Sequence, residues 1–226
     1  MSLSQDTFFA ILNIVIIDII LGGDNAVVIA LACRKLPENR RNKAIFLGTG
    51  LAVILRICLT AVTVTLLKIP LLLLIGGVLL LFIAYKLIAN QNEDMTIKAG
   101  NTLWSAIRTI VVADLVMGLD NILGIAGASN GRIELVILGL CISVPIIIWG
   151  SKLILVAMDY IPGLIYIGGG VLAYTASKMI VGEPLIEQWL EEHLTLKPVI
   201  TLSLIIGVLV LGWFKNFVGH RSSNPS

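Results

Sequence analysis

Long apolar runs alternate with short polar segments along the whole chain. A bilayer core of about 30 Å needs roughly 20 apolar residues per helix. By that measure seven stretches are predicted to span a membrane: Phe8–Cys33, Lys43–Leu67, Leu71–Ala89, Trp104–Ala128, Ile133–Ala157, Pro162–Val181 and Val199–Val218. The pattern predicts an all-α polytopic membrane protein whose single transmembrane domain occupies residues 1–226.

Composition supports this prediction. Hydrophobic residues make up 58% of the chain and charged residues 13%, and the mean hydropathy is +1.00. Soluble domains carry about 25% charged residues. The first apolar run has no basic segment before it and is too long for a signal peptide, so we interpret it as a permanent span. The three cysteines lie in apolar runs without metal-binding spacing, which favours buried thiols.

The loops predict an orientation. The densest basic cluster lies between the first two spans and contains Arg34, Lys35, Arg40, Arg41 and Lys43. By the positive-inside rule this loop is cytoplasmic. Seven alternating spans then place the N-terminus outside and the C-terminus in the cytoplasm, and we expect the plasma membrane. The loop 183–197 is acidic, and its apolar positions after Pro184 predict an amphipathic helix on the outer surface.

Two acidic motifs interrupt the apolar pattern. The first runs from Asp18 to Asp24-Asn25, and the second from Asp114 to Asp120-Asn121. Both have the form D-x5-D-N, and the copies lie 96 residues apart. Because ionisable side chains within hydrocarbon are costly, they indicate a functional site.

Further matches extend the repeat. An Ile-Pro pair, a Gly-Gly pair and a lysine recur at the same spacing: Ile69-Pro70, Gly76-Gly77 and Lys86, then Ile161-Pro162, Gly168-Gly169 and Lys178. The first repeat covers about 8–90, the second about 104–181, and an extra helix covers about 199–218. Three spans per repeat is an odd number, so the repeats are expected to be inverted, a common plan of secondary transporters.

An inverted repeat arranges the acids in two layers. Asp18 is expected beside Asp120 and Asn121 on the outer side, and Asp24 with Asn25 beside Asp114 on the inner side. In an ideal helix Asp24 and Asp120 would point away from the stripe of Asp18 and Asp114. A helix break or close packing at Gly22 and Gly118 would relieve this, and the adjacent pair Gly22-Gly23 favours a break in the first span.

The predicted ligands are oxygen atoms from four carboxylates and two amides. Such a set suits hard divalent ions such as Mg²⁺, Ca²⁺ or Mn²⁺. Met117 shares the stripe of Asp114 and either packs in the core or supplies a softer ligand that favours Mn²⁺. We expect no prosthetic group and no nucleic-acid partner.

Four acids around one divalent ion leave uncompensated negative charge, so some of them are expected to take up protons when metal is absent. Competition between protons and metal at one site is the minimum that an antiporter requires. Arg56, at the centre of the second span, is the cation best placed to offset the remaining charge. It is either a fixed counter-ion or a tethered substitute for the metal.

Three classes of function fit these features. A divalent-cation exporter that exchanges against protons explains the four matched acids best. A membrane scaffold with a structural cation, serving an assembly or secretion partner, is the alternative. An intramembrane aspartyl hydrolase is disfavoured, because the repeat gives four equivalent acids instead of one reactive pair, so no enzymatic activity is expected.

The two motifs resemble the signatures of the TerC family of integral membrane proteins. The strings Gly22-Gly23-Asp24-Asn25-Ala26 and Asp114-Leu-Val-Met-Gly-Leu-Asp120-Asn121 carry the resemblance, which covers most of the chain. It implies seven spans, a distant similarity to LysE-type exporters, and export of manganese. The family's acidic positions would be Asp18, Asp24, Asn25, Asp114, Asp120 and Asn121. The second motif has Gly118-Leu119 in place of Gly22-Gly23, which disfavours a break there.

Overall fold

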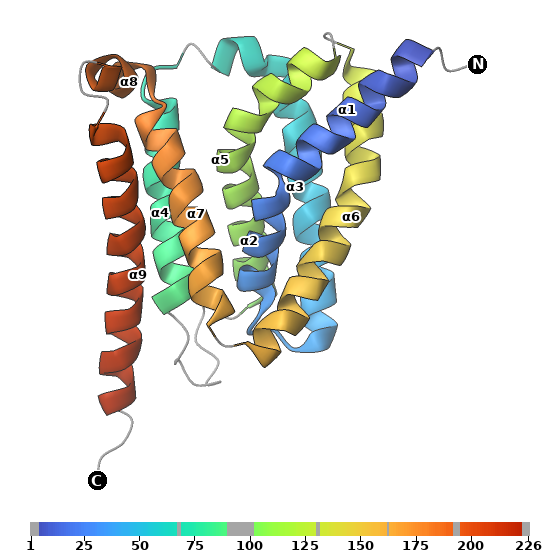
Figure 1. Cartoon of the computed structure of the whole chain (residues 1–226). Helices are drawn as coiled ribbons and strands as arrows, with labels where there is room; N and C mark the ends of the chain where they lie inside the picture. Colours follow the sequence, from blue (N-terminus) through green and yellow to red (C-terminus); the bar gives the residue numbers. More distant parts are fainter. Residues whose placement is uncertain are drawn as a thin grey trace. The chain divides into compact units, whose positions relative to one another are not determined.

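A computed structural model describes residues 5–66, 69–89, 102–129, 132–161, 163–191 and 195–222. These parts of the chain are helical and contain no strand (Figure 1), which confirms the predicted all-α class. The helices are α1 (Gln5–Leu21), α2 (Gly23–Cys33), α3 (Glu38–Leu66), α4 (Leu72–Ala89), α5 (Leu103–Ser129), α6 (Ile133–Tyr160), α7 (Leu164–Val181), α8 (Pro184–Glu191) and α9 (Leu196–Ser222).

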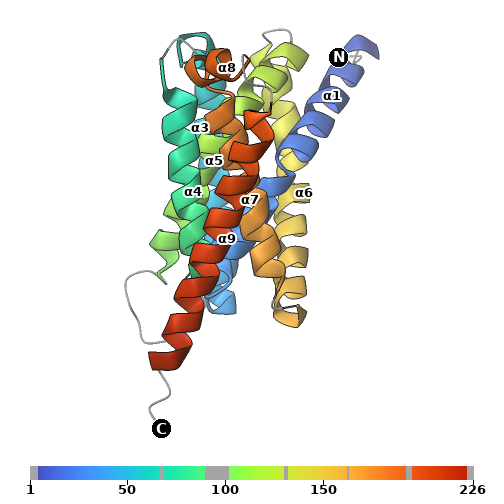
Figure 2. The same cartoon turned by 60° about the vertical axis from the view of Figure 1, so that its left-hand side comes forward.

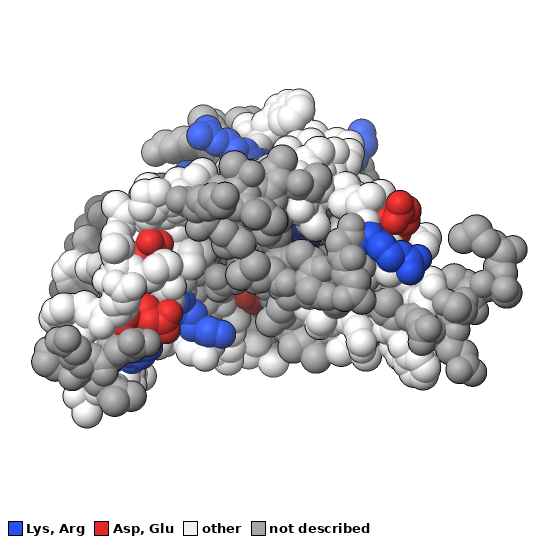
Figure 3. All heavy atoms as spheres, turned by 90° about the horizontal axis from the view of Figure 1, so that it is seen from above, with Lys and Arg blue, Asp and Glu red and all other residues white. Residues whose placement is uncertain are grey.

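Five helices in the described ranges are long and apolar enough to cross a membrane, namely α3, α4, α6, α7 and α9. The count rises to six if α1 and α2 form one bent span. Large apolar side chains such as Phe46, Ile75 and Trp149 are exposed on these helices, as lipid-facing residues would be. Figure 3 shows the molecule from above, where Lys and Arg (blue) and Asp and Glu (red) are scattered among other residues (white).

The first predicted span is broken at Gly22. Helix α1 ends at Leu21, α2 begins at Gly23, and the two helices are bent by 46°. Gly22 has φ −99° and ψ 7°, outside the helical region. A β-carbon at Gly22 would overlap the carbonyl oxygen of Asp18, to which the Gly22 N–H donates a hydrogen bond, whereas one at Gly23 would meet no atom within 4 Å. Glycine is therefore required at the first of these positions.

The chain forms two compact units. The first comprises Met1–Pro70 and Thr102–Val156 and contains α1, α2, α3, α5 and most of α6. Within it, α5 packs along α3 and also contacts α1 and α2. A cluster of buried side chains joins α1 to α6: Ile14, Leu135, Val136 and Leu140. Close approach is possible because Ile14 lies over Gly139 of α6, while Ile110 of α5 lies over Gly48 of α3.

The second unit comprises Leu71–Asn101 and Ala157–Ser226. Helices α4, α7 and α9 pack together, and α8 contacts α7 (Figure 2). Asn216 of α9 is buried and donates to the carbonyl of Ile88 on α4 and to the hydroxyl of Tyr166 on α7. One polar side chain thus joins three helices.

Helix α8 is the amphipathic helix that the sequence predicts. Leu190 is fully buried, whereas Leu185 and Trp189 are exposed.

Glu183, the residue before α8, is also buried, and its carboxylate accepts hydrogen bonds from the backbone N–H groups of Leu71, Leu73 and Leu74. Glu183 therefore caps the N-terminus of α4, where Leu71 adopts a positive φ of 62°.

Candidate cation site

The site is built around the side chain of Asp18, near the end of α1. This carboxylate is fully buried. One oxygen accepts a hydrogen bond from Arg56 Nη1 at 2.5 Å, and the other accepts one from the hydroxyl of Ser143 on α6. Both oxygens of Asp18 are therefore occupied by protein donors.

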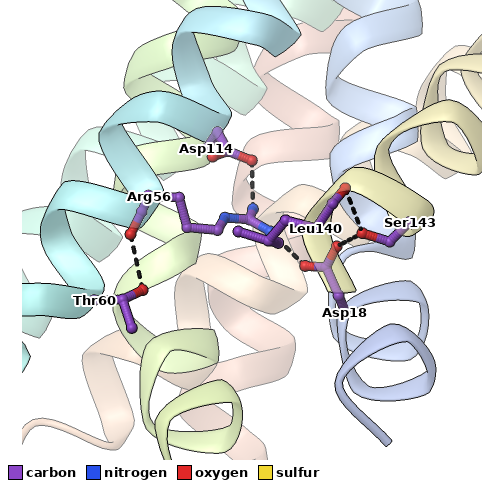
Figure 4. A network of polar contacts seen from close by, with 6 residues as sticks. All are labelled: Asp18, Arg56, Thr60, Asp114, Leu140 and Ser143. Atoms are coloured by element: carbon purple, nitrogen blue, oxygen red, sulfur yellow. Dashed lines mark hydrogen bonds and ion pairs between the residues drawn. The ribbon is translucent and has the colours of Figure 1, made fainter. Parts of the chain in front are cut away.

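Arg56 joins this carboxylate to a second one. Its side chain extends from α3, and Nη2 donates to Asp114 Oδ1 on α5, also at 2.5 Å (Figure 4). The flat guanidinium presents several donors in a fixed fork, so it can hold two carboxylates at once. One turn further along α3, the Thr60 hydroxyl donates to the backbone carbonyl of Arg56. The bridge thus connects α1, α3 and α5.

Burial makes this bridge energetically consequential. Arg56 is 4% exposed, Asp18 is fully buried and the Asp114 side chain is 14% exposed. Removing one partner of a buried ion pair leaves an uncompensated charge and typically costs about 3–5 kcal/mol. Two carboxylates share one guanidinium, so the three side chains together carry one net negative charge when ionised. That charge favours a cation nearby.

A small cavity adjoins the bridge. About 20 Å³ of its volume can hold a water-sized sphere, which is enough for one water molecule or one ion. Its polar lining consists of Asn25, Thr49, Arg56 and Asp114, and the remaining lining is apolar. Asn25 and Thr49 are 4% and 5% exposed. Within the described parts of the chain, the Asn25 amide, the Thr49 hydroxyl and Arg56 Nε have no hydrogen-bond partner.

Asn25 and Asp114, which the sequence predicts to lie side by side in the inner layer, both line the cavity. The bridge, however, differs from the layered arrangement, which separates Asp18 from Asp114. In the structure, the guanidinium of Arg56 pairs with both carboxylates and joins them in one network. The sequence indicated Arg56 as a counter-charge, but it did not predict that a single guanidinium would serve both acids.

The other predicted residues lie on α2 and α5. Asp24 lies in the first turn of α2 and is partly buried. Met117 of α5 is 2% exposed and does not line the cavity. Helix α5 continues through Gly118, so the second motif has no break. The backbones of Asp120 and Asn121 belong to α5, but their side chains lie outside the described residues. Among the residues described, no three His, Cys, Asp or Glu side chains form a metal-binding group.

Sequence reasoning missed two hydroxyl groups at this site. Thr49 precedes Arg56 by seven residues, two helical turns, and so lies on the same face of α3. That spacing could have identified it. Ser143 stands alone in an apolar run of α6, and no spacing relates it to Asp18 across 125 residues.

Comparison with known proteins places these features in a family. The model described as "Integral membrane protein TerC family" matches residues 3–223. A relative from Bacillus subtilis strain 168, described as "Uncharacterized membrane protein YjbE", is 50% identical over 207 residues, which cover 90% of this chain and 95% of the relative.

More distant relatives are longer. The inner membrane protein YoaE of Escherichia coli K12, of the group UPF0053, is 28% identical over 239 residues. The match covers 95% of this chain but 45% of YoaE. A UPF0053 protein of Buchnera aphidicola subsp. Schizaphis graminum is likewise 28% identical, over 99% of this chain and 46% of its own length. The chain thus spans less than half of these two relatives. No solved structure matches it.

Proposed function

Since the chain belongs to the TerC family of integral membrane proteins, we propose that it is a secondary transporter that exports Mn²⁺ from the cytoplasm, in exchange for protons. Mg²⁺ or Ca²⁺ are the other hard ions that such a site would accept. The observation that carries the proposal is the buried network of Asp18, Arg56 and Asp114 beside a polar cavity. Ionisable groups buried within an apolar helix bundle are a feature of ion pathways.

The cation ligands in this proposal are oxygen atoms from both motifs: Asp18, Asp24, Asn25, Asp114, Asp120 and Asn121. The break at Gly22 supports it as well, because α1 ends at Leu21 and the last turn of a helix generally has carbonyl groups without an intrahelical partner. Transporters use such interrupted helices to coordinate cations near the midplane. The buried thioether of Met117 would tilt the preference towards Mn²⁺.

In this proposal the exporter has two inverted three-helix repeats and α9 as a seventh span. Movement of one repeat against the other gives it alternating access. Reciprocal contacts in the first unit support this repeat. Ile14 lies over Gly139 and Ile110 lies over Gly48. Ile110 follows Ile14 by 96 residues, the same offset that separates Asp114 from Asp18. A two-fold axis relating the repeats would exchange these two contacts.

The second unit contains a matching pair of contacts. Ile88 of α4 lies over Gly169 of α7, and Ile180 of α7 lies over Gly77 of α4. Both the two isoleucines and the two glycines are 92 residues apart. A two-fold exchange within this unit describes the pair, so the contacts of each unit, taken by itself, fit an inverted repeat. The basic loop at 34–43 then faces the cytoplasm, with the N-terminus outside.

Flux through purified protein in liposomes tests the proposal. Vesicles containing a Mn²⁺-sensitive dye are expected to take up Mn²⁺ faster with the protein than without it, and an opposing proton gradient should accelerate the uptake. A membrane scaffold with a structural cation would bind the metal without transporting it. Binding of Mn²⁺ without flux at any pH would therefore refute the exporter proposal and favour the scaffold.

A further inference from the structure

The two carboxylates at the centre of the site already accept hydrogen bonds from protein donors. Asp18 uses both oxygens, one for Arg56 and one for Ser143, and Asp114 uses Oδ1 for Arg56. A divalent ion bound directly to these oxygens would lie next to the guanidinium. Two cations at such short range repel each other strongly, and a buried site screens that repulsion less than water does.

The adjoining cavity is lined by the same Arg56 side chain. Asn25 and Thr49 line it as well, and each of the three side chains has a buried polar atom with no partner in the described structure. Buried polar atoms are almost always hydrogen-bonded, so these atoms indicate an occupant. Asn25 and Thr49 supply oxygen atoms there, and Asp114 adds a carboxylate at the wall.

Gly118 of α5 lies beside Arg56 Nε, and a β-carbon at this position would be 3.8 Å from that nitrogen. Glycine therefore leaves α5 without a side chain at this position beside Arg56.

We propose that Arg56 is an internal competitor of the transported cation. It holds Asp18 and Asp114 when no metal is bound, and a divalent cation enters through the adjoining cavity and binds the carboxylates as the guanidinium withdraws. Thr49, together with Asn25, gives the entering ion its first oxygen ligands. This inference rests on the proposed cation transport and adds a residue, Thr49, and a role for Arg56.

The alternative role for Arg56, a fixed counter-ion, makes the opposite prediction for metal affinity. A fixed counter-ion organises the acids, so its removal weakens metal binding. A competitor occupies the acids, so its removal strengthens metal binding. Equilibrium affinity therefore separates the two roles, whereas loss of transport would not.

The experiment measures Mn²⁺ binding to purified full-length protein in detergent, from the fall of the electron paramagnetic resonance signal of free Mn²⁺. Arg56→Gln is expected to bind Mn²⁺ about tenfold more tightly or better, because even water-screened repulsion by a cation in contact is worth about that ratio. Thr49→Val keeps the shape of the side chain and should weaken binding roughly three- to tenfold. Thr109→Val is the matched control, since the Thr109 hydroxyl donates to the carbonyl of Ser105 and Thr109 does not line the cavity.

Arg56→Lys covers the case in which Arg56→Gln does not fold. Lysine keeps the charge but is a point donor that cannot bridge two carboxylates in the arginine geometry, so its Mn²⁺ affinity should lie between those of the wild type and Arg56→Gln. Unchanged or weaker binding by a folded Arg56 variant overturns the competitor role, even if the wild type transports Mn²⁺. Tighter binding by the variants, with no flux through the wild type in liposomes, would instead refute the exporter and leave the competition intact.

Discussion

Ile88 of α4 lies directly over Gly169 of α7, where a β-carbon would overlap the isoleucine side chain. The contact brings the two backbones close together, as small residues do between membrane helices. Gly169→Ala is therefore expected to destabilise the protein by about 1–3 kcal/mol through overpacking, measured as thermal unfolding in detergent. Added to Ile88→Ala, the same substitution should cost almost nothing, because its steric partner is gone.

Gly207→Ala is the control for this contact. A β-carbon there meets no atom within 4 Å, and alanine is about 0.5–1 kcal/mol more favourable than glycine inside a helix. Equal stability of Gly169→Ala and Gly207→Ala would show that the α4–α7 contact does not depend on glycine.

The break between α1 and α2 gives a second prediction. Gly22→Ala places a β-carbon against the backbone oxygen of Asp18, which cannot rotate away as a side chain could. We expect a loss of stability of about 1–3 kcal/mol and a clear loss of Mn²⁺ flux, because Asp18 belongs to the site. Gly23→Ala meets no neighbour and should retain both. If the two variants behave alike in unfolding and flux assays, the geometry of the break does not control the site.

Helix content and the broken first span could be predicted from the sequence because both depend on local pattern. Runs of apolar residues identified the spans, and Gly22-Gly23 beside costly acids identified the break. The α3 boundary was less accurate: the helix begins at Glu38, directly after Pro37, whereas hydropathy placed the span from Lys43. Hydropathy detects the part of a helix that lies in lipid, and α3 continues beyond it.

The contacts of the site depend on tertiary geometry and could be predicted only in part. Arg56 stood out as a charge in an apolar run, but its two partners lie 38 and 58 residues away in the chain. A repeat predicts equivalent contacts, whereas Arg56 has no equivalent: 91 residues later, at the offset from Gly48 to Gly139, stands Ile147. The asymmetry of the site is therefore what the repeat could not predict.

Glu183 gives a prediction about stability alone. Its buried carboxylate accepts hydrogen bonds from three backbone N–H groups at the start of α4, the closest from Leu71 at 2.9 Å. Charge-assisted bonds of this kind are stronger than neutral ones, so Glu183→Gln should lower stability by about 1–3 kcal/mol. Glu187→Gln is the control, because Glu187 is 48% exposed and its ion pair with Lys197 is worth about 1 kcal/mol or less. Similar unfolding temperatures for the two variants would rule out the capping role.

The acids of the two motifs give a prediction about function. If the proposed site is correct, Asp24→Asn and Asp120→Asn each remove a charged ligand, and each is expected to abolish manganese tolerance in cells lacking other manganese exporters. The loss of metal affinity should be at least the roughly tenfold that even outer-shell changes cause at metal sites. Asp159→Asn, at the exposed end of α6, is the control and should remain tolerant. Wild-type tolerance of both motif variants at normal expression would exclude these residues from the site.

Met117 gives a prediction about ion preference. The side chain is 2% exposed, so replacement by alanine would mix a cavity cost with any effect on metal binding. Met117→Leu nearly conserves volume, costs less than about 1.5 kcal/mol and removes only the sulfur. If the thioether is a ligand, Mn²⁺ loses a soft partner while Ca²⁺, which binds oxygen, loses nothing. We therefore expect the ratio of Mn²⁺ to Ca²⁺ flux in liposomes to fall in Met117→Leu, with the unfolding temperature nearly unchanged. A constant ratio would show that Met117 only packs between helices, and any preference for Mn²⁺ would then have to come from the oxygen ligands and the size of the cavity beside Arg56.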